Sequence, residues 1–344
     1  MTARLHSILW RDAEIDRLIS SDAEIAAMLE FEAVLAQTQA KSGVIPADAA
    51  TAIAQLCKGF VPDTERLLRG IARDGMAVPE LVRQLRAALP AEHRDSLHLR
   101  STSQDVIDTV LIMQIRKACM LLEVRLSDIA TKLNELQKKF GDVQQMGRTR
   151  MQRALPLKAG DRIEAWRAPL LRHSQRLHEL RPRLLVVQCG GPIGVDHGQW
   201  LPELAAALGL GVPPRSWHSA RDALAEFASW LSLVTGSLGK IGIDAAMLVQ
   251  NEMGEAAIAG GGTSSAMHHK SNPVLAEVLV ALARYNAAQL GGFHQALVHE
   301  QERSGSAWTL EWMILPDMLS ACASSLAHGS ALLGALTLKE SHPR

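Results

Sequence analysis

The chain has 344 residues, 47% apolar and 21% charged, which suits one large soluble domain or two to three smaller ones with an ample core. Lysine plus arginine and aspartate plus glutamate balance at 36 each, so net charge offers no basis for binding nucleic acid or an anionic membrane surface. No apolar run reaches the ~18 residues that span a bilayer, and we expect neither a membrane segment nor a secretory signal. The four cysteines form no CxxC pair, which favours reduced thiols in a cytoplasmic protein without a zinc or redox centre.

Short helical patterns fill the first hundred residues. The segment 21–24, SDAE, has the form of a capping box, and apolar residues follow it at helical spacing. Pro79 suits the first turn of a later helix, and Pro90 ends that helix. We therefore expect a small helical domain over residues 1–100, with helices over 21–43, 47–58, 65–71 and 79–90.

The longest predicted helix spans residues 103–140, where neither glycine nor proline occurs. Apolar residues recur along it at helical spacing, and at 1.5 Å per residue it would be ~50 Å long. A helix of this length rarely stands alone, because its apolar stripe needs partners. We expect it to belong to a central helical bundle over residues 101–300, of a kind that often forms between subunits.

The rest of the chain continues the helical pattern. Pro182 is expected to end the helix before it, and Pro316 to kink the last helix. Residues 184–187 are the only strand-like fragment, and no hairpin signals recur. The predicted fold class is therefore all-α, with a short C-terminal helical segment over 301–344. The expected helices are 161–181, 201–208, 219–238 resuming over 244–258, 274–298 and 307–337.

Three polar islands interrupt this pattern. The first island, residues 98–105, carries His98, Thr102 and Ser103 at the entrance to the longest helix. Hydroxyls and free backbone N–H groups at a helix N-terminus form an anion site. The alternative is that Thr102 or Ser103 only caps the helix.

The second island, residues 147–153, has the sequence GRTRMQR and contains Thr149, Arg150 and Gln152. Its arginines, hydroxyl and amide are suitable ligands for a carboxylate. The alternative is a solvated basic turn.

The third island, residues 260–273, has the sequence GGGTSSAMHHKSNP and joins two helical patterns. Its glycines, two serines and Lys270 suit a lid over an anionic substrate, and the alternative is a flexible linker. The lysine lacks the flanking residues of a phosphate-binding P-loop. Adjacent His268 and His269 do not have metal-ligand spacing, so we expect no metal.

Taken together, the islands resemble the three signatures of the fumarase/aspartase superfamily. The first is similar to H-x-G-x-T-S-x-D-x-x-D-T, the second to G-R-T-H-x-Q-x-A-x-P, and the third to GSSxMPxKxNP. Their order and spacing match over about residues 20–300. Within the superfamily, the stretches STSQDVIDT, RTRMQRALP and GGTSSAMHHKSNP are most similar to bacterial cycloisomerases that lactonise a tricarboxylate diene.

The resemblance implies a long helical bundle that forms a homotetramer, with each active site built from the three islands of three subunits. It also implies that the usual C-terminal helical domain is mostly missing. It gives Ser264 the role of base and acid, and it gives Lys270 and Asn272 the role of stabilising charge on the substrate. It implies no metal and no nucleotide or other cofactor. The implied substrate-binding residues are His98, Thr102, Ser103, Thr149, Arg150, Gln152, Ser265 and Met267.

Arg221, at the start of a later helix, is a weaker candidate for substrate binding, and the alternative is a charge on the surface of that helix.

The sequence departs from the superfamily signatures in ways that bear on the reaction. Arg150 replaces a histidine that helps to protonate a departing amine or oxygen in the lyases. A departing carboxylate needs little acid help, and arginine orients carboxylates well, so this change favours cycloisomerisation over cleavage of argininosuccinate or adenylosuccinate. Arg100 replaces a glycine, Thr263 another glycine, and His268 a proline. Two alternatives stay open: a lyase that releases fumarate from a succinyl-amine, and a helical oligomer that has lost catalysis.

Overall fold

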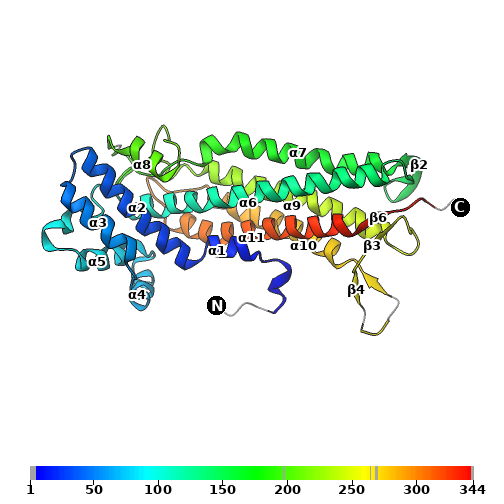
Figure 1. Cartoon of the computed structure of the whole chain (residues 1–344), viewed down its shortest axis with the longest axis horizontal. Coiled ribbons are helices and arrows are strands. Elements are labelled where there is room, and N and C mark those ends of the chain that lie inside the picture. Colours follow the sequence, from blue (N-terminus) through cyan, green and yellow to red (C-terminus); the bar gives the residue numbers. More distant parts are fainter. Residues whose placement is uncertain (1–4, 197, 264, 268–269, 342–344) are drawn as a thin grey trace.

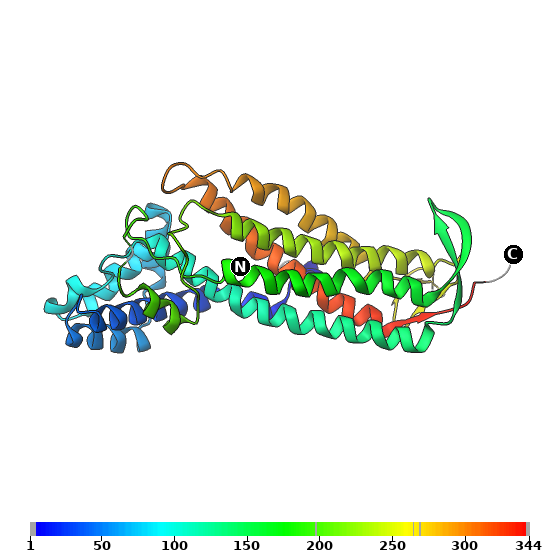
Figure 2. The same cartoon turned by 90° about the horizontal axis from the view of Figure 1, so that it is seen from above.

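The computed structural model describes residues 5–196, 198–263, 265–267 and 270–341. The chain forms an elongated bundle whose long helices run along its length (Figure 1). Figure 2 shows these helices side by side. The predicted all-α class is confirmed. The bundle helices are α6 (Ser103–Phe140), α7 (Ala159–Leu184), α9 (Asp222–Leu248), α10 (Val274–Gln295) and α11 (Ser306–Ala335).

Helix α6 spans the predicted residues because an unbroken apolar repeat drives its packing. Buried residues recur at alternating spacings of three and four, the pattern of a coiled-coil seam. The positions are Ile112, Ile115, Cys119, Leu122, Leu126, Ile129, Leu133 and Leu136. They form one hydrophobic core with the other bundle helices.

Shorter helices gather around the N-terminal end of α6 (Figure 1). They share a second hydrophobic core, to which helix α8 (Leu201–Leu208) also contributes. Packing at this end therefore draws on residues beyond the first hundred, and the predicted domain boundaries stay predictions. The other elements here are the 3-10 helix Ala91–Ser96 and helices α2 (Ser21–Lys41), α3 (Ala47–Gly59), α4 (Thr64–Asp74) and α5 (Val78–Ala88). Helix α1 (Ala13–Leu18) and the 3-10 helix Leu5–Leu9 pack instead along the bundle, where Ile15 joins the bundle core.

Several predicted helix ends are wrong. Helix α2 is capped by Ser20, not Ser21, since the Ser20 hydroxyl accepts a hydrogen bond from the N–H of Ala23. Helix α9 begins at Asp222 rather than at Ser219. Helix α7 continues two residues past Pro182.

Helix α9 is also continuous where a break was predicted after residue 238. Gly239 and Gly242, in the segment where the break was predicted, permit close packing on α10. A Cβ on Gly239 would lie 2.5 Å from the Cβ of Ala283, and one on Gly242 would lie 2.7 Å from the carbonyl oxygen of Ala276. These contacts supply the stability that glycine costs a helix.

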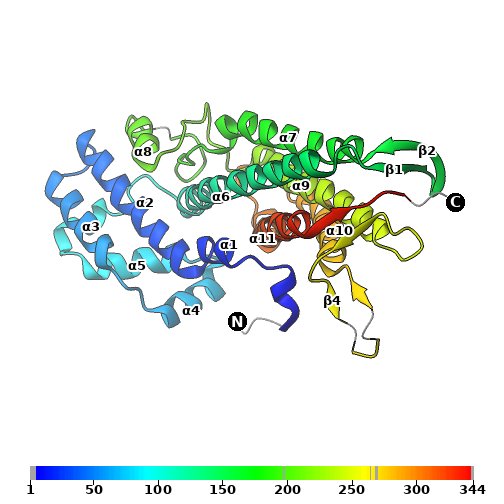
Figure 3. The same ribbon diagram turned by 45° about the vertical axis from the view of Figure 1, so that its right-hand side comes forward.

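Three two-stranded antiparallel sheets lie at the far end of the bundle (Figure 3). Strand β1 (Gln144–Thr149) pairs with β2 (Gln152–Lys158), β3 (Ala256–Ile258) with β6 (Leu336–Leu338), and β4 (Gly262–Thr263) with β5 (Ser271–Asn272). The sequence pattern does not predict these strands. The fragment predicted as strand-like forms only an isolated bridge between Val186 and Gly211.

Helix α9 is long and apolar enough to cross a membrane by length and composition alone, but half of its most apolar window is buried inside the protein. Core helices of soluble bundles have the same properties.

Candidate active site

The first island is held in a strained backbone at the N-terminus of α6. His98 and Arg100 have φ values of 61° and 55°, in the left-handed region that favours glycine. This explains why the superfamily has glycine at the place of Arg100. Thr102 is the N-cap of α6 in a capping box, and its N–H donates to the carboxylate of Asp105 at 3.0 Å.

His98 contacts a buried carboxylate that the sequence analysis missed. The Nδ1 atom of His98 lies 2.5 Å from Oε1 of Glu32 on α2, and the Glu32 side chain is 1% exposed. Burial opposes protonation of His98, but the charge and hydrogen bond of Glu32 outweigh it and raise the pKa of His98. Glu32 could have been noticed in the sequence, because it is an acidic residue among the apolar positions that α2 buries.

Two aspartates of the first signature are structural anchors. Asp105 accepts hydrogen bonds from the N–H groups of Gly190 and Gly191, both at 3.0 Å, and lies 2.8 Å from Nε2 of His218. Asp108 pairs with Arg221 at 2.6 and 3.0 Å. Both aspartates are fully buried.

Arg221 is not a charge on a helix surface, because its side chain is fully buried. Its guanidinium donates to both carboxylate oxygens of Asp108 and to both of Glu311, with distances of 2.5–3.0 Å. Four of its five N–H donors are thereby used. We therefore leave Arg221 out of the proposed substrate site and assign it to this ion-pair network.

The second island forms the turn of the β1–β2 hairpin. Arg150 and Met151 occupy the two central turn positions with φ values of 50° and 67°, as a type I′ turn requires, although neither is glycine or asparagine. Thr149, Arg150 and Gln152 are exposed. Arg148 differs, since it forms a bidentate ion pair with Glu255 at 2.6 and 2.9 Å. The turn thus presents a strained, exposed arginine, and such strain is concentrated at functional sites.

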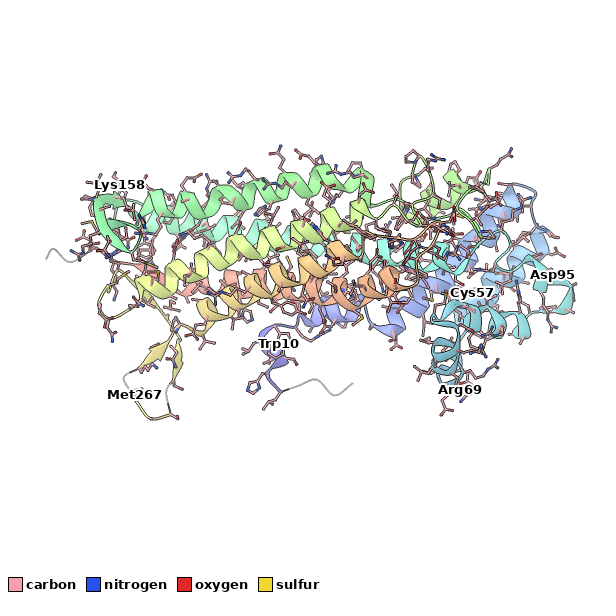
Figure 4. The ribbon with its side chains drawn as sticks, turned by 180° about the vertical axis from the view of Figure 1, so that it is seen from behind. Trp10, Cys57, Arg69, Asp95, Lys158 and Met267 are labelled. Atoms are coloured by element: carbon pink, nitrogen blue, oxygen red, sulfur yellow. The ribbon has the colours of Figure 1, made fainter. Side chains whose placement is uncertain are left out.

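The third island forms a small hairpin that projects from the bundle, with Met267 near its tip (Figure 4). Gly260 has a φ of 70°. Gly261 permits close approach, since a Cβ there would lie 2.1 Å from the Oγ of Ser271. Lys270, Ser265 and Met267 are exposed, and Asn272 is half-buried in strand β5. The predicted catalytic Ser264 lies outside the described residues, as does His268.

One chain does not bring the three islands together. The first island lies at the start of α6 and the second follows its end, 38 residues later, a helix length of about 57 Å. Figure 4 shows this separation, with Asp95 near the first island and Lys158 beside the second at opposite ends of the molecule. The third island lies at the same end as the second but points away from the bundle. Within one chain, the described residues of the three islands therefore do not form a single site.

Comparison with known proteins defines the class. A family model described as lyase matches residues 10–285, and the chain belongs to this family, that of the fumarase/aspartase superfamily.

Individual relatives show which members of the family the chain resembles. The chain is 40% identical to 3-carboxy-cis,cis-muconate cycloisomerase of Pseudomonas aeruginosa, over 97% of this chain and 75% of that protein. It superposes on the 3-carboxy-cis,cis-muconate lactonizing enzyme from Pseudomonas putida with a TM-score of 0.91 at 36% identity, covering 98% of this chain and 78% of the other. It is also 30% identical to N-acetyl-S-(2-succino)cysteine lyase of Enterococcus italicus, over 95% of this chain and 74% of that protein.

Proposed function

We propose that the protein is a cycloisomerase that converts 3-carboxy-cis,cis-muconate to 4-carboxymuconolactone in the protocatechuate, or β-ketoadipate, route of aromatic degradation. The observation that carries this proposal is Arg150. It lies exposed at a strained turn, without a carboxylate partner among the described residues, where the lyases have a histidine. Relatives at 34–40% identity that bear the cycloisomerase name support the same assignment.

The proposed reaction joins an oxygen of the substrate's own carboxylate to one carbon of a C=C bond. The neighbouring carbon takes up one proton and lies next to a second carboxylate, on which charge builds as an aci-carboxylate. Lys270 and Asn272 stabilise this charge. Ser264 delivers the proton, which solvent then replaces, and a serine hydroxyl can do this only in a cationic, pre-organised site.

The remaining predicted residues hold the substrate's carboxylates. They are His98, Thr102 and Ser103 from the first island, Thr149, Arg150 and Gln152 from the second, and Ser265 and Met267 from the third. We propose that three subunits of a homotetramer supply these islands to each site. The separation of the islands along α6 supports this arrangement. The reaction as written needs no metal, nucleotide or other cofactor.

We also propose a cytoplasmic location, which four buried, unpaired cysteines support.

The function is tested by adding the purified protein to 3-carboxy-cis,cis-muconate and following the ultraviolet absorbance of the diene. Loss of absorbance with formation of a lactone is the expected result. Release of fumarate from argininosuccinate or adenylosuccinate, without lactone formation, would replace the proposal with the lyase alternative. Turnover of none of these substrates would favour the non-catalytic alternative. Full activity in Ser264→Ala would remove the proton-transfer role of that serine.

A further inference from the structure

A cavity of about 360 Å³ lies between the β1–β2 hairpin, the first turn of α7 and the second half of α9. Four cationic side chains and one carboxylate line it, and methionine and isoleucine side chains complete its wall. The charged residues are Arg148, Arg150, Arg162, Lys240 and Asp244. Neither Arg162 nor Lys240 belongs to the three islands.

Two of the four cations are already neutralised. Glu255 holds Arg148, and Asp244 accepts hydrogen bonds from Lys240 at 2.5 Å and from the indole N–H of Trp166 at 2.7 Å. In the part of the chain that the structure describes, no carboxylate lies within 4 Å of either Arg150 or Arg162. Asp244 and Glu255 attract Arg162 from a distance but are already paired with other cations, so the cavity region keeps an excess of positive charge, which suits a dianion.

Arg162 is the more unusual of these two arginines. Its Nε is buried without a hydrogen-bond partner, and its Nη2 makes only a long contact of 3.4 Å to the carbonyl oxygen of Met146. Burial lowers its pKa. A desolvated guanidinium with unused donors is costly to the folded protein, and a ligand with acceptor oxygens would remove that cost.

We propose that this cavity is a subsite for two carboxylates of the substrate, in which Arg162 binds one carboxylate and Arg150 the other. The apolar wall faces the carbon chain between them. Lys240 lies at the exposed rim and stays paired with Asp244. The identity of the ligand rests on the proposed function, whereas the presence of a dianion site rests on the cavity itself.

The test is calorimetric titration of the whole protein with propane-1,2,3-tricarboxylate, a saturated tricarboxylate, at one fixed salt concentration. Arg162→Gln should weaken binding about tenfold to a hundredfold, the effect of losing a charge-assisted hydrogen-bonded pair. Arg162→Lys should recover part of the affinity by restoring the charge. The matched control is Arg172→Gln, an exposed arginine farther along α7, which should bind as the wild type does.

Unchanged affinity in Arg162→Gln would overturn the inference. If that variant does not fold, as judged by circular dichroism and light scattering, Arg150→Gln decides: weaker binding supports the subsite, and unchanged binding contradicts it. Failure of the proposed function can be recognised separately. Binding that depends on Arg162, without lactone formation from the muconate, would keep the dianion site and reject the reaction. Lactone formation with an unchanged KM in Arg162→Gln would keep the reaction and reject the subsite.

Discussion

Some charged residues near the two ends of helix α6 differ in whether the chain itself supplies their partners. At its N-terminal end, Asp108, Arg221 and Glu311 are buried and pair with one another. At the other end of the bundle, Arg150 and Lys270 are exposed and have no carboxylate partner within the described residues. We propose from this contrast that Asp108 is an anchor, whose charge is satisfied within the chain, whereas Arg150 and Lys270 are available to bind a substrate.

The largest expected effect comes from breaking the anchored end. Asp108→Ala should lower the free energy of unfolding by about 3–5 kcal/mol, because it leaves part of the Arg221 charge buried and unpaired. Asp108 also accepts hydrogen bonds from Gln104 and from the indole N–H of Trp308. Urea unfolding at fixed protein concentration measures the change.

The control for this experiment is Asp128→Ala, an exposed aspartate on the same helix, which should change stability by less than about 0.5 kcal/mol. A loss below about 1 kcal/mol in Asp108→Ala would show that the network is not an anchor.

At the end of the bundle that carries Lys270, we expect a substitution to lower activity and leave stability unchanged. Lys270→Ala should lower kcat about 10²–10³-fold, the usual effect of losing one group that stabilises transition-state charge, and leave the melting temperature unchanged because the side chain is exposed. Steady-state kinetics and thermal unfolding measure the two effects. Lys138→Ala, exposed on α6, is the matched control. A kcat within twofold of the wild type would remove Lys270 from catalysis.

A smaller effect, dependent on pH, should appear at the pair formed by His98 and Glu32. Because the pKa of His98 is raised in the folded protein, the protonated pair contributes stability that is fully present below the unfolded value of about 6.5 and is lost as pH rises through the raised value. The difference in unfolding free energy between wild type and His98→Asn should therefore shrink from pH 5.5 to pH 9. In a Glu32→Gln background, this difference in unfolding free energy should no longer depend on pH. A difference that grows as pH rises would contradict a raised pKa of His98.

The sequence predicted the long helices well because their apolar repeats are local signals. Helix α6 was predicted with both ends, since its seam has no competing glycine or proline. Prediction failed where tertiary contacts overrode local pattern. The pattern predicted an interruption between residues 238 and 244, yet α9 is continuous there, and Gly239 and Gly242 allow α10 to pack closely against it. The hairpin of the second island also escaped prediction, because its turn uses Arg150 and Met151 where glycine or asparagine would be the recognisable signal.

The site was predictable only in part. Motif spacing identified residues of all three islands. It could not tell buried, paired residues from residues available to a substrate, as the burial of Arg221 shows. Glu32 contacts His98 across 66 residues, and the cavity beside Arg162 forms only where α9 packs near the hairpin, so motif spacing reveals neither residue. The assignments of Ser264, Lys270 and the substrate-binding residues stay predictions.

The central claim, that each site takes its islands from different copies, is tested most directly by mixing two inactive variants. His98→Ala impairs the first island and Lys270→Ala the third. If the two islands of one site come from different chains, co-expressing both variants in equal amounts should restore about a quarter of wild-type activity, through mixed oligomers in which some sites receive two intact islands. Activity no higher than that of either variant alone would contradict the claim.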